Sequence, residues 1–137
     1  MVKRYLLDTD TCSYVIRRRP EAVLTAMQGL AEDGADLYIS AITYAELRLG
    51  AARSGSASKH NRLIDGFCER LDAIQPWDTD AADHFARLQA LLFKKGTPIG
   101  NNDTMIAGHA LSLSTILVTN NTKHFAKVPK LKIENWT

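Results

Sequence analysis

Residues 5–11 read Tyr5-Leu6-Leu7-Asp8-Thr9-Asp10-Thr11, an apolar run that ends abruptly in an acidic, hydroxyl-rich turn. This pattern is typical of a buried strand that leads directly into a helix. In open α/β sheets, ligands gather outside the carboxyl ends of such strands. Asp8 is therefore the first candidate for chemistry, although Asp8 or Asp10 could instead only cap the following helix.

Strands and helices alternate along the rest of the chain. The β-branched run Thr115–Val118 is expected to be the most central strand, with Asn101 and Asn102 as caps of the helix before it. We expect a single α/β domain over residues 1–137, in which helices flank a mainly parallel sheet of about four to five strands. The expected strands are 3–8, 36–40, 73–77, 115–118 and an edge strand at 132–134, and the expected helices are 10–18, 20–34, 41–50, 61–72, 78–95 and 103–113.

The composition indicates an ordinary globular chain. With 137 residues, 45% of them apolar, the chain can bury the core of one domain. The net charge of +2 does not by itself indicate a nucleic-acid binder. Cys12 and Cys68 lack CxxC spacing, which argues against a structural zinc site or a disulfide scaffold. No signal peptide or long apolar run occurs, so we expect a soluble cytoplasmic protein that does not associate with membranes.

A second carboxylate, Glu46, is expected to point inward from its helix. It lies four positions after Ile42 and three before Leu49, which places it on the apolar stripe. Because burial of an unpaired charge is unfavourable, an inward Glu is usually paired, bound to a metal or used in catalysis. The alternative is an ion pair with Arg48 or Arg53 on a solvated face.

A third carboxylate, Asp103, stands at a helix start and shares a stripe with Ile106 and Ala107. A first-turn Asp is also favoured simply by the helix dipole. Asp8, Glu46 and Asp103 could nevertheless converge at one end of a parallel sheet, where they would repel one another. A hard divalent cation, Mg²⁺ or Mn²⁺, would relieve that repulsion. Such a site suits phosphodiester hydrolysis, in which the metal activates a water and one carboxylate accepts its proton.

Four stretches of the chain, with its ending Val128–Trp136, resemble a known family. They are Leu6–Cys12, Ser40–Gly50, Gly96–Ala110 and Val118–Phe125. In order and spacing they are similar to the PIN-domain ribonucleases, and specifically to the VapC toxins of bacterial toxin–antitoxin pairs. The resemblance covers nearly the whole chain.

This resemblance implies a PIN-like fold and a divalent-metal endoribonuclease. Asp8, Glu46 and Asp103 would form the acidic site, with Asp8 and Asp103 as metal ligands; the polar neighbours would be Thr9 and Thr119 or Asn121. The chain departs from the family pattern at two positions. Asp10 stands where the family often has Asn, and His124 stands where many members carry an acid, which puts a fourth acidic ligand in doubt. His124 could instead hydrogen-bond a phosphate or be merely exposed.

The resemblance also implies partners. They are a second copy of the chain, bound through helices near the N-terminal half, and a cognate VapB-type antitoxin whose C-terminal segment blocks the active groove. The implied substrate is structured RNA, with a tRNA anticodon stem-loop, that of initiator tRNA above all, as the leading candidate. The candidate phosphate contacts at the rim are Lys94, Lys95, Lys123 and Lys127.

Two other functions remain open from the sequence. Asp8-Thr9-Asp10 after a strand imitates the nucleophile and acid of haloacid-dehalogenase-like phosphatases, although the fifth position is Cys12 and no second Asp-Asp pair follows. A PIN relative that binds RNA without cleaving it is the non-enzymatic alternative. Retention of all three acids argues against that alternative.

Overall fold

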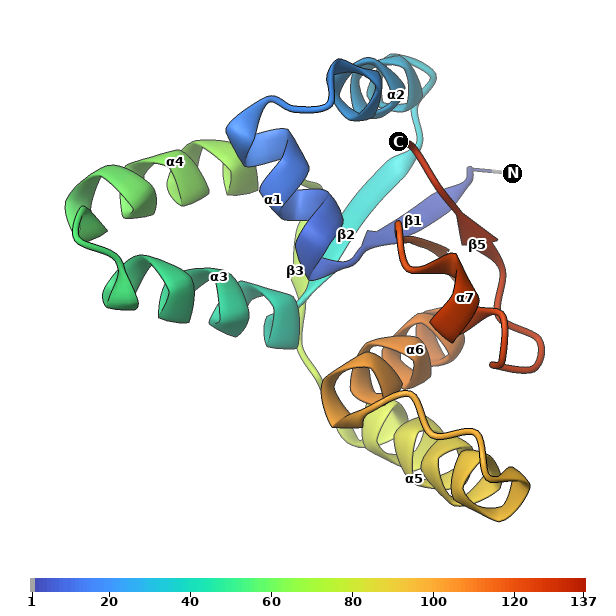
Figure 1. The fold of residues 1–137 in the computed structure, drawn as a ribbon. Coiled ribbons are helices and arrows are strands. Elements are labelled where there is room, and N and C mark those ends of the chain that lie inside the picture. Colours follow the sequence, from blue (N-terminus) through green and yellow to red (C-terminus); the bar gives the residue numbers. More distant parts are fainter. Residues whose placement is uncertain (1) are drawn as a thin grey trace.

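A parallel five-stranded sheet forms the centre of the protein (Figure 1). The computed structural model describes residues 2–137. The strand order is β3-β2-β1-β4-β5, and every neighbouring pair is parallel. The strands are β1 (Arg4–Leu7), β2 (Asp36–Ser40), β3 (Ala73–Gln75), β4 (Ile116–Val118) and β5 (Ile133–Glu134). The predicted α/β class and the edge position of the last strand are confirmed.

Helices cover both faces of the sheet because the strands carry apolar residues on both faces. In β1, Tyr5 and Leu7 pack into the cluster under α1 to α4, whereas Leu6 packs into the cluster under α5 to α7. This alternation follows from the two-residue period of a strand. The helices are α1 (Thr9–Arg17), α2 (Glu21–Glu32), α3 (Ala41–Arg53), α4 (Ala57–Glu69), α5 (Thr79–Lys95), α6 (Asn101–Leu113) and α7 (Thr122–Phe125).

The central strand is β1, and the prediction that the β-branched strand would be the central one is wrong. β4 lies between β1 and the edge strand β5. Leu117 and Val118 are nevertheless fully buried, because Leu117 packs under α6 and α7, Val118 packs into the cluster under α1 to α4 on the other face, and β5 pairs along the outer side. The β-branched residues of β4 therefore predicted correctly that the strand is buried, but they did not predict its position in the strand order.

The end of α3 and both ends of α4 differ from the sequence prediction. α3 continues through this glycine to Arg53, since a glycine inside a helix costs only about 1 kcal/mol. α4 occupies residues 57–69 and not 61–72. It ends early because Asp72 pairs with β2: its backbone N–H donates to the Leu37 carbonyl (2.8 Å), and its Oδ2 accepts from the Leu37 N–H (2.7 Å).

The start of α6 also differs. Asn101 and Asn102 lie in its first turn and do not cap it; the N-cap is Gly100, with a φ of 97°. That backbone conformation is readily available only to glycine. The helix starts two residues earlier than expected, which places the Asn102 side chain on the helix, next to Asp103.

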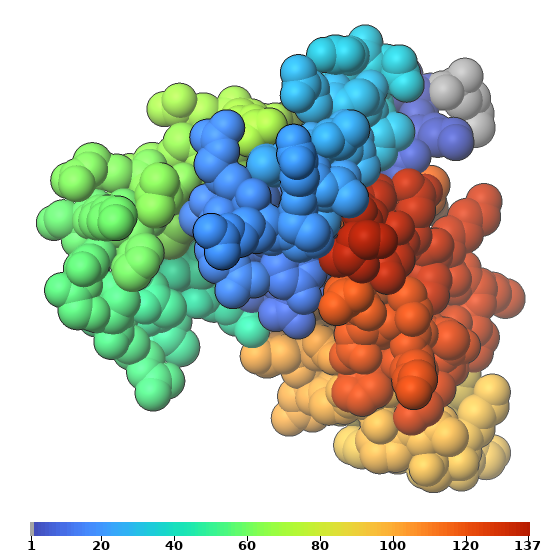
Figure 2. Space-filling model, turned by 45° about the horizontal axis from the view of Figure 1, so that its top comes forward, coloured from blue at the N-terminus to red at the C-terminus, as the bar shows by residue number. Residues whose placement is uncertain are grey.

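The N-termini of α1, α3 and α6 meet at the carboxyl edge of the sheet (Figure 1). On the face shown in Figure 2, α1 and α2 (blue) pack beside the C-terminal segment (red), and α3 and α4 (green) project to one side. Asn120 ties that segment to α1 through a hydrogen bond to the Tyr14 hydroxyl (3.2 Å). None of the helices within residues 2–137 has the length and apolar character needed to cross a bilayer.

Candidate active site

Asp8 lies at the junction of β1 and α1. Its backbone N–H donates to the Val118 carbonyl (3.0 Å), which continues the pairing of β1 with β4. Its Oδ1 accepts a hydrogen bond from the Thr11 N–H (2.9 Å), so Asp8 is the N-cap of α1. This cap bond engages only one of the two carboxylate oxygens. Asp8 is thus both the cap and a buried acid, with an exposed fraction of 8%.

The surroundings of Asp8 favour proton retention. Burial raises the pKa of Asp8 above its ordinary value, and the nearby charge of Asp10 acts in the same direction. Hydrogen bonds from Thr119 and Thr11 oppose the rise in this pKa. Asp10 itself is exposed in the first turn of α1, so the prediction that it could be the helix cap is wrong. Its contribution is electrostatic.

Glu46 connects three helices. Thr9 Oγ1, at the start of α1, donates to Glu46 Oε1 at 2.9 Å. Asn102 Nδ2, in the first turn of α6, donates to Glu46 Oε2 at 3.4 Å. Thr43, also on α3, forms a second hydrogen bond with the Thr9 hydroxyl, with 3.2 Å between the two Oγ1 atoms. Both oxygens of the Glu46 carboxylate therefore have a fixed donor.

The expected apolar stripe through Glu46 is wrong in detail. Leu49 is 56% exposed, and the residues that α3 buries are Thr43, Leu47 and Ala51. Glu46 lies at the border of this buried face and is half-buried. The alternative ion pair with Arg48 is also absent, because Arg48 contacts Asp65 and the Asn61 side chain on α4.

Asp103 lies in the first turn of α6 beside Asn102. Its Oδ2 is 3.3 Å from His124 Nδ1 on the short helix α7. Sequence reasoning placed His124 at a position where relatives carry an acid but did not foresee this contact, which depends on how α7 folds against α6. The His124 side chain is 45% exposed, and both expectations for it, a hydrogen bond to a phosphate or a merely exposed side chain, stay predictions.

A continuous series of contacts therefore runs along the carboxyl edge of the sheet. It passes from Asp8 to its neighbour Thr9, then to Glu46, Asn102 and its neighbour Asp103. Asn102 was missed as a site residue because it was interpreted as a cap. Its position directly before a candidate acid was the only signal in the sequence.

The remaining predicted residues differ in their placement. Thr119 is fully buried at the end of β4, and its Oγ1 accepts from the Asn121 N–H (2.9 Å). Asn121 is the N-cap position of α7, without a side-chain cap bond. The four candidate RNA contacts are all exposed, at the end of α5 and around α7: Lys94, Lys95, Lys123 and Lys127.

The donor atoms at this edge suit a hard cation. They are carboxylate, hydroxyl and amide oxygens, which Mg²⁺ prefers. Within residues 2–137, no three His, Cys, Asp or Glu side chains are close enough together to hold one ion without rearrangement. Mg²⁺ retains several waters and commonly binds proteins through one or two carboxylates. The residues therefore fit a hydrated magnesium ion better than a closed site in which every ligand is a side chain.

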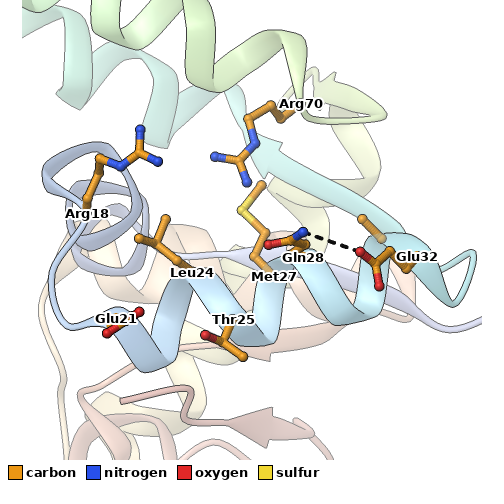
Figure 3. A pocket seen from close by; sticks show the side chains of 9 residues that line it. Arg18, Glu21, Leu24, Thr25, Met27, Gln28, Glu32 and Arg70 are labelled. Carbon is orange, nitrogen blue, oxygen red and sulfur yellow. Dashed lines mark hydrogen bonds between the residues drawn. The ribbon is translucent and has the colours of Figure 1, made fainter.

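Two grooves lie near the N-terminal helices. One, of about 280 Å³, begins at Thr9 and Glu46 and runs between α1 and α3 toward His60 and Ile64. The other, of about 710 Å³, lies beside α2, with Arg18 and Arg70 over Leu24 and Met27 (Figure 3). This second groove includes none of the three carboxylates. The smaller groove opens from the acidic edge itself.

The buried Asp8 and the half-buried Glu46 and Asp103 lie at the carboxyl edge of a parallel sheet, so the protein is an α/β domain with an acidic site beyond β1. The profile of the PIN domain family matches residues 5–131. The chain belongs to the PIN-domain family, and its full-length relatives are VapC proteins. The resemblance stated from the sequence is confirmed.

Two relatives and one solved structure illustrate the match. The tRNA(fMet)-specific endonuclease VapC of Salmonella typhimurium is 38% identical over 133 residues, which cover 97% of this chain and 98% of that protein. Ribonuclease VapC2 of Rickettsia felis is 36% identical, covering 96% and 97%. The crystal structure of VapBC2 from Rickettsia felis bound to a DNA fragment from its promoter contains a chain that superposes with a TM-score of 0.91 at 35% identity, covering 98% and 99%.

Proposed function

We propose that the chain is the toxin of a toxin–antitoxin pair, a divalent-metal-dependent endoribonuclease that cleaves tRNA. The observation that carries this proposal is the contact series from Asp8 through Glu46 to Asp103, in a chain that matches VapC ribonucleases over its full length. Family membership favours this function over the phosphatase alternative. Initiator tRNA is the leading substrate candidate, because one close relative is named for it.

Each acid has a role that its surroundings support. Asp8 and Asp103 would hold the ion, since Asp8 is buried beside Thr119 and Asp103 is oriented by His124. Glu46 would accept the proton of the attacking water, because Thr9 and Asn102 hold its two oxygens in place. When bound, Mg²⁺ or Mn²⁺ would supply a Lewis acid that activates water and neutralises charge on the phosphate.

The hydrolysis has a simple balance. Water adds to the phosphorus, the bond from phosphorus to the leaving oxygen breaks, and the leaving oxygen takes a proton. Glu46 is the acceptor at the attacking side. Lys123 and Lys127, in and just after α7, would contact neighbouring phosphates; their exposure supports this role.

Two partners complete the proposal. Solved structures similar to this chain are VapBC complexes, such as the DNA-bound VapBC of Salmonella typhimurium, 38% identical with a TM-score of 0.89 and all of both chains covered. This similarity supports a VapB-type antitoxin as partner here. A homodimer remains our expectation from the family. Copurification of a VapB-type protein with the chain tests the first partner, and the mass of the purified chain by light scattering tests the second.

The deciding experiment is cleavage of purified tRNAs. The chain, free of antitoxin, is incubated with initiator tRNA and with an elongator tRNA, in Mg²⁺ and in excess chelator. We expect one discrete cut in initiator tRNA that requires the metal and is lost in Asp8→Asn and Asp103→Asn. Equal cleavage in chelator would disprove the metal mechanism. RNA binding without cleavage would favour the inactive PIN alternative, and hydrolysis of a small phosphomonoester alone would favour the phosphatase.

A further inference from the structure

A buried histidine on α6 is not used by the proposed reaction. His109 is 1% exposed and Ser40 is fully buried, and His109 Nδ1 lies 2.8 Å from Ser40 Oγ. The two residues are 69 positions apart in the chain. This hydrogen bond is a buried side-chain link between α6 and the junction of β2 with α3.

Ser40 also caps α3. It is the N-cap of this helix, and its Oγ accepts from the Ile42 N–H (3.1 Å). A hydroxyl has one proton to donate and a second lone pair with which to accept, so the imidazole tautomer sets which partner donates in the bond between Ser40 Oγ and His109 Nδ1. With either tautomer, one buried oxygen joins the start of α3 to the ring on α6.

The surroundings of His109 favour a neutral ring. Burial lowers the pKa of His109, and the Asp78 carboxylate and the Pro76 carbonyl only partly oppose this change. Among the described residues, Nε2 makes no hydrogen bond of ordinary length and angle. The bond to Ser40 is therefore the contact that fixes the ring.

The link lies at equal distance from two of the three acids. Glu46 is six residues after Ser40 on α3, and Asp103 is six residues before His109 on α6. At 1.5 Å per residue, each acid lies about 9 Å along its helix from the link. In Figure 1, α3 leads away from the carboxyl end of β2, and the start of α6 lies near the first turns of α3.

On the side of α6 away from Ser40, the helix packs closely against α5. A Cβ at Gly108 would lie 2.8 Å from the backbone of Phe85, so α6 packs directly on α5 there. With α5 on one side and Ser40 on the other, α6 has little freedom to slide. Among residues 2–137, Glu46 on α3 is joined to the first turn of α6 by one long hydrogen bond, from Asn102 Nδ2 to Glu46 Oε2 at 3.4 Å.

We propose that the Ser40–His109 hydrogen bond sets the position of α6 relative to α3, and so of Asp103, a proposed ligand of the cation, relative to Glu46, the proposed proton acceptor. His109 is then a positioning residue. This inference rests on the proposed function. A displacement of about 1 Å within such a site can reduce a rate about a hundred-fold.

The test uses two substitutions at one position. His109→Leu keeps the side-chain volume but removes both nitrogens, whereas His109→Asn retains an acceptor near the Nδ1 position. The matched control is Ser112→Ala, which removes a hydrogen bond made within α6 itself, from Ser112 Oγ to the His109 carbonyl (2.7 Å). Three quantities are measured: Mg²⁺ affinity of the RNA-free chain by calorimetry, kcat and KM for RNA cleavage, and the urea midpoint of unfolding.

For His109→Leu we expect Mg²⁺ affinity and kcat to fall by roughly ten- to a hundred-fold. KM should stay nearly constant, and the urea midpoint should change little, because the loss of the bond to Ser40 and the loss of the unpaired Nε2 act in opposite directions. His109→Asn should recover most of the lost affinity and kcat, and Ser112→Ala should match the wild type. A parallel fall of kcat and urea midpoint, with no recovery in His109→Asn, would show a purely structural role and overturn the proposal.

Failure of the two proposals can be told apart. If the wild type cleaves RNA and His109→Leu does so equally with the same Mg²⁺ affinity, the positioning role is overturned and the function stands. If the wild type binds Mg²⁺ but cuts no RNA, the function fails, and the affinities of the variants still decide the positioning role. A wild type that binds no Mg²⁺ overturns both.

Discussion

Thr9 Oγ1 donates a hydrogen bond to Glu46 Oε1 at 2.9 Å and thereby joins the start of α1 to the middle of α3. The two residues are 37 positions apart, and Thr9 directly follows the buried Asp8. The Thr9 hydroxyl thus fixes the orientation of Glu46 relative to the end of β1, where Asp8 lies. The predictions below concern this edge of the sheet and the helix packing that supports it.

Removal of the Thr9 hydroxyl should impair catalysis without unfolding the chain. Thr9→Val keeps the side-chain shape but leaves Glu46 Oε1 without its donor, so we expect RNA cleavage to slow by roughly ten- to a hundred-fold. Thr9→Ser retains the hydroxyl and should stay close to the wild type. The measurement is kcat for both variants, with circular dichroism as the check of folding. Equal rates for Val and Ser would refute the role of this bond.

Asp8→Asn should alter the pH dependence of stability. Because burial raises the pKa of Asp8 above its ordinary value of 3.8, the folded state holds this proton more tightly than the unfolded state. The stability that results is fully present below 3.8 and is lost as pH rises through the raised folded pKa. Asn keeps a cap acceptor for α1 but does not titrate.

We therefore expect the unfolding free energy of metal-free Asp8→Asn, relative to the wild type, to increase from acid to neutral pH. Urea unfolding at a series of pH values measures this difference. Asp10→Asn, at an exposed position on the same helix turn, is the control and should show a smaller change. A difference that shrinks toward neutral pH would contradict the assigned direction.

His124→Asp should strengthen metal binding. The substitution places a carboxylate beside Asp103, at the position where His124 now contacts Asp103 Oδ2. Added negative charge increases the attraction for a divalent cation. We expect half-maximal cleavage at a lower Mg²⁺ concentration. His124→Asn, which changes size similarly without adding charge, should lack this gain, and a gain shared by both variants would point to loss of the imidazole as the cause.

Gly108→Ala should destabilise the fold. The new Cβ would lie 2.8 Å from backbone atoms of Phe85, so α5 and α6 would have to separate. Overpacking of this kind typically costs about 1–3 kcal/mol. Gly66→Ala is the matched control, because its added Cβ meets nothing within 4 Å and Ala favours the helix by up to about 1 kcal/mol. Urea unfolding of both variants measures the contrast.

The sequence alone determined the alternation of strands and helices and the three acids. Hydrophobic period and cap residues are local signals, and they placed β1, β2 and α5 within a residue or two. The predicted end of α4 was wrong because Asp72 pairs with Leu37 of β2, a residue far away in the chain. The predicted place of β4 was wrong because a strand can be fully covered without being the central one.

The tertiary structure decided how the acids relate to one another. The hydrogen bonds of Glu46 to Thr9 and Asn102, and the contact of His124 with Asp103, join residues far apart in the chain. The Ser40–His109 bond is of the same kind. A sequence shows which side chains could carry charge or donate a proton. The distance between two such groups depends on the packing of whole helices on the sheet, and no local pattern encodes it.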